Sequence, residues 1–209
     1  MKHNKQNIFL ITIIIFILYK ISFQYINRNN VIYIPDFLTN KEHNYIKQLN
    51  TDKEGFIFEK FRYIKPLNNS TINKIFYSPQ KIRRINKILK KKVFKSNFPI
   101  EHRIYSEDSN GMDWHIDTLL YDKPQYEAVY TINNESNSFT EWIDFDGRLH
   151  TQWTEPNSLL LVKAKGYKHH VSPTIDGERH ILKLIYTQSN EENSNYYKEL
   201  ERFKKIKLK

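Results

Sequence analysis

The second half of the chain alternates short apolar runs with turn signals, and this feature restricts the possible folds most. Asp146-Gly147, between two apolar runs, is the two-residue signal of a β-hairpin. About eight short strands at such close spacing predict a sandwich or a barrel. The predicted strands cover residues 101–105, 113–120, 128–132, 139–145, 148–153, 158–162, 169–171 and 180–187.

The residues before this region mix strand and helix signals. Residues 31–34, 56–58 and 61–64 are short apolar runs typical of strands. Thr39 and Glu42 have the spacing of a capping box and predict a helix start, and Ser78-Pro79 predicts a second one. The chain is therefore expected to be mostly β, of the α+β class, with helices packed on one sheet.

Composition limits the chemistry that the chain can perform. Its 209 residues provide one domain with an appendage, and an aromatic content of 14% indicates a folded core. The chain has no cysteine, which excludes disulfides, zinc–thiolate sites, iron–sulfur clusters and thiol nucleophiles. Any bound metal must be held by His, Asp and Glu side chains.

The charge is strongly basic, with 33 Lys and Arg against 23 Asp and Glu and a formal net charge of +10. Much of the excess lies in residues 81–92 and 204–209. A dispersed basic helix face is usually solvated, so specific nucleic-acid binding is not expected.

The N-terminal region carries an apolar run at residues 8–18. As a helix this run spans only about 16 Å, whereas continuing it to Ile26 gives about 28 Å, close to the thickness of a bilayer core. Lys2 and Lys5 precede the run as in a signal peptide, but no small-x-small cleavage site follows. An uncleaved single-pass anchor over residues 1–28 is the favoured interpretation, with a cleaved signal and a buried helix as alternatives. Basic residues on both sides of the run leave the orientation open.

His115 and Asp117 lie two residues apart in a predicted strand, so both side chains face the same side. An imidazole and a carboxylate are two of the three ligands in the two-His, one-carboxylate triad that holds non-haem Fe(II). The adjacent pair His169 and His170, in a later predicted strand, can supply the third. Strand parity cannot choose between these two, and an isolated His-x-Asp is also often a plain surface hydrogen bond.

The segment around His169 resembles the closing motif of iron- and 2-oxoglutarate-dependent oxygenases of the prolyl 4-hydroxylase type. In that family the ligand His is followed by a Val and a Pro, a Gly, a basic residue ten positions on and an apolar strand. The matching residues here are His169, Val171, Pro173, Gly177 and Arg179. Residues 112–117, 103–105 and 31–42 resemble the family's first ligand motif, its tyrosine strand and its entry strand and helix. The resemblance covers about residues 31–187.

This resemblance implies the ligands and the cosubstrates. It assigns His115, Asp117 and His169 to Fe(II), with His170 in a position that the family fills with a small residue. It implies 2-oxoglutarate and O2 as cosubstrates, with ascorbate as a further cofactor. Arg179 would bind the distal carboxylate of 2-oxoglutarate through two parallel hydrogen bonds, and Tyr105 would add a phenolic hydrogen bond. No side-chain acid, base or nucleophile is required, so no catalytic residue of that kind is predicted.

The predicted fold is a double-stranded β-helix, or jelly roll, and the predicted function is hydroxylation of an amino-acid side chain in a peptide or protein. Proline is the first substrate guess, and lysine or another amino acid is the close alternative. Oxidative dealkylation of nucleic acid is less favoured, because that branch carries a second Arg six residues after the first, where this chain has Ile185. A metal-free β-sandwich binding module is the non-enzymatic alternative.

The expected organisation is an anchor over residues 1–28, an oxygenase domain over 31–187 and a basic tail over 188–209. The resemblance favours a lumenal catalytic domain, and the oligomeric state is open. Trp114, Trp142 and Trp153 are interpreted as packing residues.

Overall fold

The computed structural model describes residues 9–18, 30–49 and 53–204, which form two antiparallel sheets and several helices. The large sheet has the strand order β1-β10-β7-β12-β5-β3-β2, and β4 also pairs with β12. Its strands are β1 Val31–Ile34, β2 Ile57–Glu59, β3 Arg62–Leu67, β4 Phe94–Lys95, β5 Ile100–Tyr105, β7 Tyr126–Asn134, β10 Leu159–Lys163 and β12 Arg179–Thr187.

The small sheet has the order β6-β11-β8-β9. Its strands are β6 Met112–His115, β8 Thr140–Ile143, β9 Leu149–Gln152 and β11 Lys168–Val171. The expectation of a mostly β chain is confirmed, and two antiparallel sheets with few helices are consistent with a jelly-roll core.

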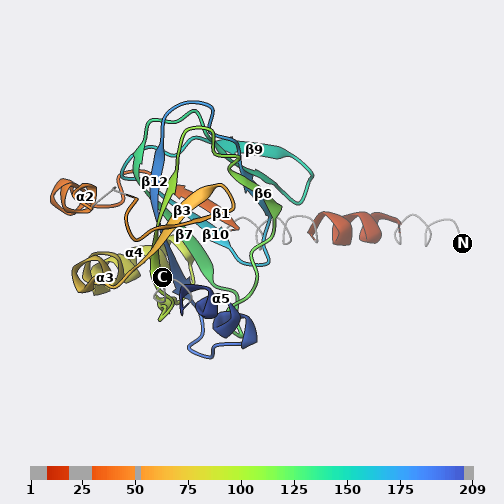
Figure 1. Cartoon of the computed structure of the whole chain (residues 1–209). Helices are drawn as coiled ribbons and strands as arrows, with labels where there is room; N and C mark the ends of the chain where they lie inside the picture. The colour runs from red at the N-terminus through yellow and green to blue at the C-terminus, as the bar shows by residue number, and fades with distance from the viewer. Residues whose placement is uncertain (1–8, 19–29, 50–52, 205–209) are drawn as a thin grey trace, which may run out of the picture.

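Three helices cover the outer face of the large sheet: α2 Asn40–Lys47, α3 Ser70–Tyr77 and α4 Pro79–Leu89. Figure 1 shows them together on one side, with β6 and β9 on the other. The buried residues of these helices form the main apolar core with alternate residues of β7, β10 and β12. Since strand residues alternate in direction, the intervening residues of those strands face the small sheet.

The helix starts follow the sequence signals. The Thr39 hydroxyl accepts from the Glu42 backbone N–H, and the Glu42 carboxylate accepts from the Thr39 N–H, completing the predicted capping box. Ser78 caps α4, with Pro79 as its first residue. Helix α3, capped by Asn69, was not predicted, although Ile72, Ile75 and Phe76 have helical spacing.

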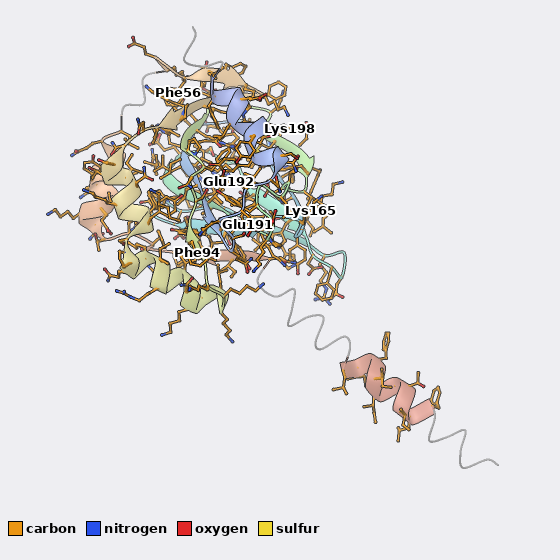
Figure 2. The ribbon with its side chains drawn as sticks, turned by 90° about the horizontal axis from the view of Figure 1, so that it is seen from below. Phe56, Phe94, Lys165, Glu191, Glu192 and Lys198 are labelled. Atoms are coloured by element: carbon orange, nitrogen blue, oxygen red, sulfur yellow. The ribbon has the colours of Figure 1, made fainter. Side chains whose placement is uncertain are left out.

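The C-terminal region contains helix α5, Ser194–Lys204. Tyr196 and Phe203 of this helix are buried in a second apolar cluster with Phe98, which connects α5 to the domain. A bridge between Tyr121 and Glu192 fixes the segment before the helix (Figure 2, where Glu192 is labelled and Lys198 marks α5).

The N-terminal prediction is described only in part. Residues 9–18 form a helix with exposed apolar side chains, and the rest of the predicted anchor lies outside the described residues. Among the described residues, no helix has both the length and the apolarity needed to cross a membrane.

Candidate metal centre

Three side chains from two separate parts of the chain converge between the sheets: His115, Asp117 and His169. His115 ends β6, His169 lies in β11, and the two residues are direct partners across these strands. Their ring centroids are 4.3 Å apart. One potential ligand atom from each of the three side chains lies within 4.8 Å of the others.

Asp117 reaches this cluster by a route that the sequence analysis did not foresee. A strand over residues 113–120 was predicted, but β6 ends at His115, so that prediction is wrong for the residues beyond it. The segment after β6 is held by a hydrogen bond from the Lys165 backbone N–H to the Asp117 carbonyl, at 3.1 Å. Asp117 therefore lies in the loop directly after β6, where this hydrogen bond fixes its backbone.

Both imidazole rings direct the same nitrogen toward the carboxylate. The Nδ1 atoms are occupied locally, with His115 2.7 Å from the Asp113 carbonyl and His169 3.0 Å from the Tyr167 carbonyl. Metal-binding histidines commonly donate their second N–H to such an acceptor, which fixes the tautomer. The Nε2 atoms then face Asp117, at 3.6 Å from Oδ1 for His115 and 3.4 Å from Oδ2 for His169.

This geometry fits a divalent first-row ion. Two ligands that each lie about 2.1 Å from one ion, at angles of about 90–110°, are themselves about 3.0–3.4 Å apart. The observed Nε2–oxygen distances are close to this range and longer than an ordinary charged hydrogen bond. Two imidazoles and one carboxylate are the donor set of the facial triad, which leaves positions free for other ligands.

The electrostatics of the cluster favour an ionised carboxylate. Burial would raise the pKa of Asp117, but His115, Lys183 and His169 together lower it. Burial would lower the pKa of His115, but the carboxylate of Asp117 and the Asp113 carbonyl raise it above its usual value. For His169 burial dominates and lowers the pKa, which favours the neutral imidazole that a metal requires.

His170 lies outside the cluster. Its Nε2 atom is 2.6 Å from a carboxylate oxygen of Glu141, and its ring stacks on Trp114 with 4.0 Å between centroids. It follows that His169, and not its neighbour, is the member of the pair placed beside Asp117.

The side-chain cluster of His115, Asp117 and His169 opens into a cavity of about 340 Å³ between the sheets. Arg179, at the start of β12, lines this cavity and is 1% exposed. Its Nη2 atom donates to the Thr140 hydroxyl at 3.3 Å, whereas Nε and Nη1 have no partner among the described residues. Burial lowers the pKa of this guanidinium, and no carboxylate in the described part of the chain pairs with it.

Tyr105 is the neighbour of Arg179 across β5 and β12. The Arg179 guanidinium carbon lies 6.0 Å from the centre of the Tyr105 ring. The phenol donates to the Met112 sulfur at 3.2 Å, a weak acceptor that an incoming carboxylate can replace. The structure thus brings Arg179 and Tyr105 into the cavity that His115, Asp117 and His169 also line.

Sequence reasoning missed several charged residues of this cavity. The sequence analysis gave Lys183 no role, but this residue lines the cavity and forms an ion pair with Glu127 at 2.5 Å. Its position four residues after Arg179, on the same face of β12, is the signal that could have identified it.

Trp142, interpreted as a packing residue, stacks on His150, and the Trp153 indole donates to the Ser136 carbonyl.

No family model matches the sequence, and no curated protein matches it. Among solved structures, this chain is similar to a 2OG-Fe(II) oxygenase family oxidoreductase from Burkholderia pseudomallei. The identity is 12% and the TM-score 0.69, over 78% of this chain and 87% of that one.

Two prolyl hydroxylases are also similar. For the prolyl-4-hydroxylase from Pseudomonas putida the identity is 15% and the TM-score 0.62, over 77% of this chain and 93% of that one. For the prolyl hydroxylase from Trichoplax adhaerens, solved with a hypoxia inducible factor peptide fragment, the identity is 15% and the TM-score 0.61, over 78% and 85%. The chain therefore has the fold of the 2OG-Fe(II) oxygenases, prolyl hydroxylases included, which confirms at the level of the fold the resemblance found in the sequence.

Proposed function

We propose that this protein is an Fe(II)- and 2-oxoglutarate-dependent dioxygenase that hydroxylates an amino-acid side chain in a peptide or protein. The observation that carries the proposal is the placement of two imidazoles and one carboxylate beside a buried, anion-deficient guanidinium in one cavity. The fold shared with 2OG-Fe(II) oxygenases supports the same conclusion.

In this proposal His115, Asp117 and His169 hold the iron, whose role when bound is to supply the oxygen chemistry that side chains cannot perform. Arg179 binds the distal carboxylate of 2-oxoglutarate through N–H groups that no described residue accepts, and burial strengthens that interaction. The Tyr105 phenol turns from the Met112 sulfur to the same carboxylate. The enclosing sheets keep water away from the reacting end of the cosubstrate.

Proline is the proposed target, because two prolyl hydroxylases share the fold and one of them is solved with a peptide fragment. The nucleic-acid alternative gains no support from the structure. Ile185, the position where that branch carries a second Arg, is buried in the apolar cluster that includes Tyr196.

The test is incubation with Fe(II), 2-oxoglutarate and a panel of proline- and lysine-containing peptides. We expect succinate formation together with a peptide mass gain of one oxygen atom, and stimulation by ascorbate. If the protein with metal does not bind 2-oxoglutarate, either with or without a peptide, the oxygenase assignment is contradicted. Succinate formation without oxidation of any proline peptide would contradict only the choice of proline.

Membrane attachment through residues 1–28 is a separate proposal that rests on the sequence and on the exposed apolar side chains of residues 9–18. The full chain is expected to remain in the membrane fraction after alkaline extraction, and a chain that begins at residue 29 to be released. Protease protection of the catalytic domain in sealed vesicles would establish the lumenal side that the resemblance favours.

A further inference from the structure

The cavity beside His115, Asp117 and His169 is lined by more basic than acidic side chains. Six cations border it, against three carboxylates, of which one is the proposed metal ligand Asp117. The cations are Lys60, Arg62, Arg103, Arg179, Lys183 and Arg202, and the other two carboxylates are Glu127 and Glu199.

Three of these six cations pair with a carboxylate. Arg103 binds the buried Glu101 carboxylate through Nε and Nη2, at 2.9 and 2.7 Å. Lys183 pairs with Glu127, and Arg202 pairs with Glu199 at 3.3 Å. Among the buried arginines of the cavity, Arg179 and Arg62 have no such partner in the part of the chain that the structure describes.

Arg62 begins β3 and is 4% exposed. Among the described residues, Nη1 makes a long contact of 3.4 Å to the Lys60 carbonyl, and Nε has no partner. Burial is the largest influence on this guanidinium and lowers its pKa. The carboxylates of Glu101 and Glu59 offset part of this cost from a distance, but no carboxylate of a described residue lies within ion-pair distance of Arg62. A buried guanidinium without a direct partner is costly, so its retention in a cavity wall indicates a place for an anion.

Arg62 lies on the opposite side of Tyr105 from Arg179. Arg179 pairs with Tyr105 across β12 and β5, and Tyr63 pairs with Ile104 across β3 and β5. Continuing that register by one residue places Arg62 beside Tyr105. The two guanidiniums therefore flank one phenol ring from two different strands, and a carboxylate held by Arg179 leaves Arg62 unpaired.

Arg62 also lies next to a cavity edge that is open to solvent. Lys60 and Phe61 form the turn of the β2–β3 hairpin, are exposed and have positive φ angles of 47° and 67°. Lys60 lines the same cavity, as does Arg202 of α5. An anionic group that enters over this hairpin meets positive charge along its path to Arg62.

We propose that Arg62 binds a carboxylate carried by the substrate, so that the preferred substrate is a peptide with an acidic residue near the oxidised side chain. This inference rests on the proposed function and deepens it. Guanidinium–carboxylate pairing through two parallel hydrogen bonds gives the contact both strength and orientation. Arg62 is then a specificity-determining residue, and it lies on the side of the Tyr105 ring opposite to the cosubstrate.

The first test compares Arg62→Met with Arg103→Met, the same substitution at two buried arginines on neighbouring strands. Removal of the unpaired Arg62 is expected to raise the Tm of the ligand-free protein by about 2–4 °C. Removal of Arg103 leaves the buried Glu101 carboxylate with only the longer 3.7 Å contact to Arg202 among the described residues, and is expected to lower the Tm by more than that. An equal fall in both variants would overturn the inference, because Arg62 would then have a structural partner.

The second test uses acetate as a carboxylate probe and acetamide as its neutral control, at constant ionic strength. In an Arg179→Met background Arg62 is the remaining unpaired guanidinium of the cavity, and acetate is expected to raise the Tm saturably. Adding Arg62→Met should abolish this rise, and acetamide should have no effect in either protein. An acetate response that is unchanged by Arg62→Met, or absent from both proteins, overturns the inference whether or not the oxygenase assignment holds.

The third test separates a substrate carboxylate from that of 2-oxoglutarate. With metal present, the Kd of 2-oxoglutarate should change less than about twofold in Arg62→Met and more than about tenfold in Arg179→Met. Peptide pairs that differ by Glu against Gln beside the target should differ in KM in the wild type and be equal in Arg62→Met, with part of the preference restored by Arg62→Lys. A loss of 2-oxoglutarate affinity equal to that of Arg179→Met would assign Arg62 to the cosubstrate and overturn the inference.

Discussion

The two sheets differ in how firmly they hold the residues of the candidate site. Arg179 lies on β12, a central strand of nine residues that pairs on both sides and is buried along almost its whole length. His115 and His169 lie on four-residue strands of the small sheet, and β6 is an edge strand with partly exposed residues. The proposed anion site is thus built into a well-protected central strand, and the proposed metal site into the more exposed of the two sheets.

The small sheet compensates for this exposure with local hydrogen bonds. Each imidazole is oriented by a backbone carbonyl two residues earlier in its own segment, Asp113 for His115 and Tyr167 for His169. Orientation of the rings therefore depends on the conformation of these strands and little on burial of the rings. Removing a ring should harm metal binding far more than folding.

The largest expected effect follows from that difference. His169→Ala should reduce metal affinity by more than the factor of about 10–100 that loss of an outer partner costs, and should reduce succinate formation to background. The Tm should change little. Metal content after dialysis and the circular dichroism melt measure the two effects.

His170→Ala is the matched control, because it removes an imidazole from the next position of the same strand. It should leave the metal content unchanged and lose only the contacts with Glu141 and Trp114. A result in which His170→Ala loses the metal and His169→Ala keeps it would reverse the ligand assignment. Retained activity in His115→Ala or Asp117→Ala would refute those ligands in the same way.

A backbone position gives the converse test, in which the small sheet loses stability. Gly111 precedes β6 with φ of +70°, and a Cβ there would lie 2.2 Å from the Val171 carbonyl oxygen of β11. Gly111→Ala must displace one of these two strands and should lower the free energy of unfolding by about 3–5 kcal/mol.

Gly147→Ala provides the comparison, since that glycine has φ of +79° but no atom within 4 Å of the added Cβ. It should cost only the backbone strain, about 1–2 kcal/mol. Urea titrations of both variants measure the difference. Equal losses would show that steric contact between β6 and β11 does not hold the small sheet.

The parts of the molecule that the sequence predicted are those determined by neighbouring residues. The capping box at Thr39, the cap at Ser78 and the hairpin around Gly147 each depend on a few adjacent side chains, and all are present. Strand positions were predicted for the same reason, although the limits of β6 were wrong.

Long-range pairing was beyond such reasoning. That His115 and His169 are direct partners depends on the register of two strands more than fifty residues apart, which the sequence indicated only through resemblance to a family. The charged cavity wall was missed because a Lys or Glu in a strand normally faces solvent. Lys183 and Glu127 are exceptions, since each neutralises the other between the sheets.

The outer face of the large sheet carries a buried imidazole whose protonation should make stability depend on pH. Burial lowers the pKa of His102 on β5 to about 3, with the nearby His180 as a second cause. In the unfolded chain the same imidazole takes up a proton near pH 6.5. Stability is therefore complete above that pH and should fall by about 1.4 kcal/mol per pH unit as the pH decreases toward 3.

His102→Leu should remove this part of the pH dependence, because no imidazole remains to be protonated in the unfolded chain. Urea midpoints at pH 7.5, 6 and 5 for both proteins give the comparison, after subtraction of the slope due to the carboxylates that both share. Parallel curves for the two proteins would show that His102 is as accessible to protons in the folded chain as in the unfolded one.

The smallest expected effect concerns the hydrogen bond that connects the two sheets at the site, from Arg179 of β12 to the Thr140 hydroxyl of β8 at 3.3 Å. Thr140→Val keeps the shape and removes the acceptor, so the guanidinium loses an orienting contact while the fold stays intact. Because a single hydrogen bond contributes about 0.5–1.5 kcal/mol, the Kd of 2-oxoglutarate should rise about 2–10-fold, with Thr140→Ser close to the wild type. Calorimetric titration in the presence of metal measures this. A rise as large as that of Arg179→Met would mean that the small sheet, and not β12, determines where the guanidinium points.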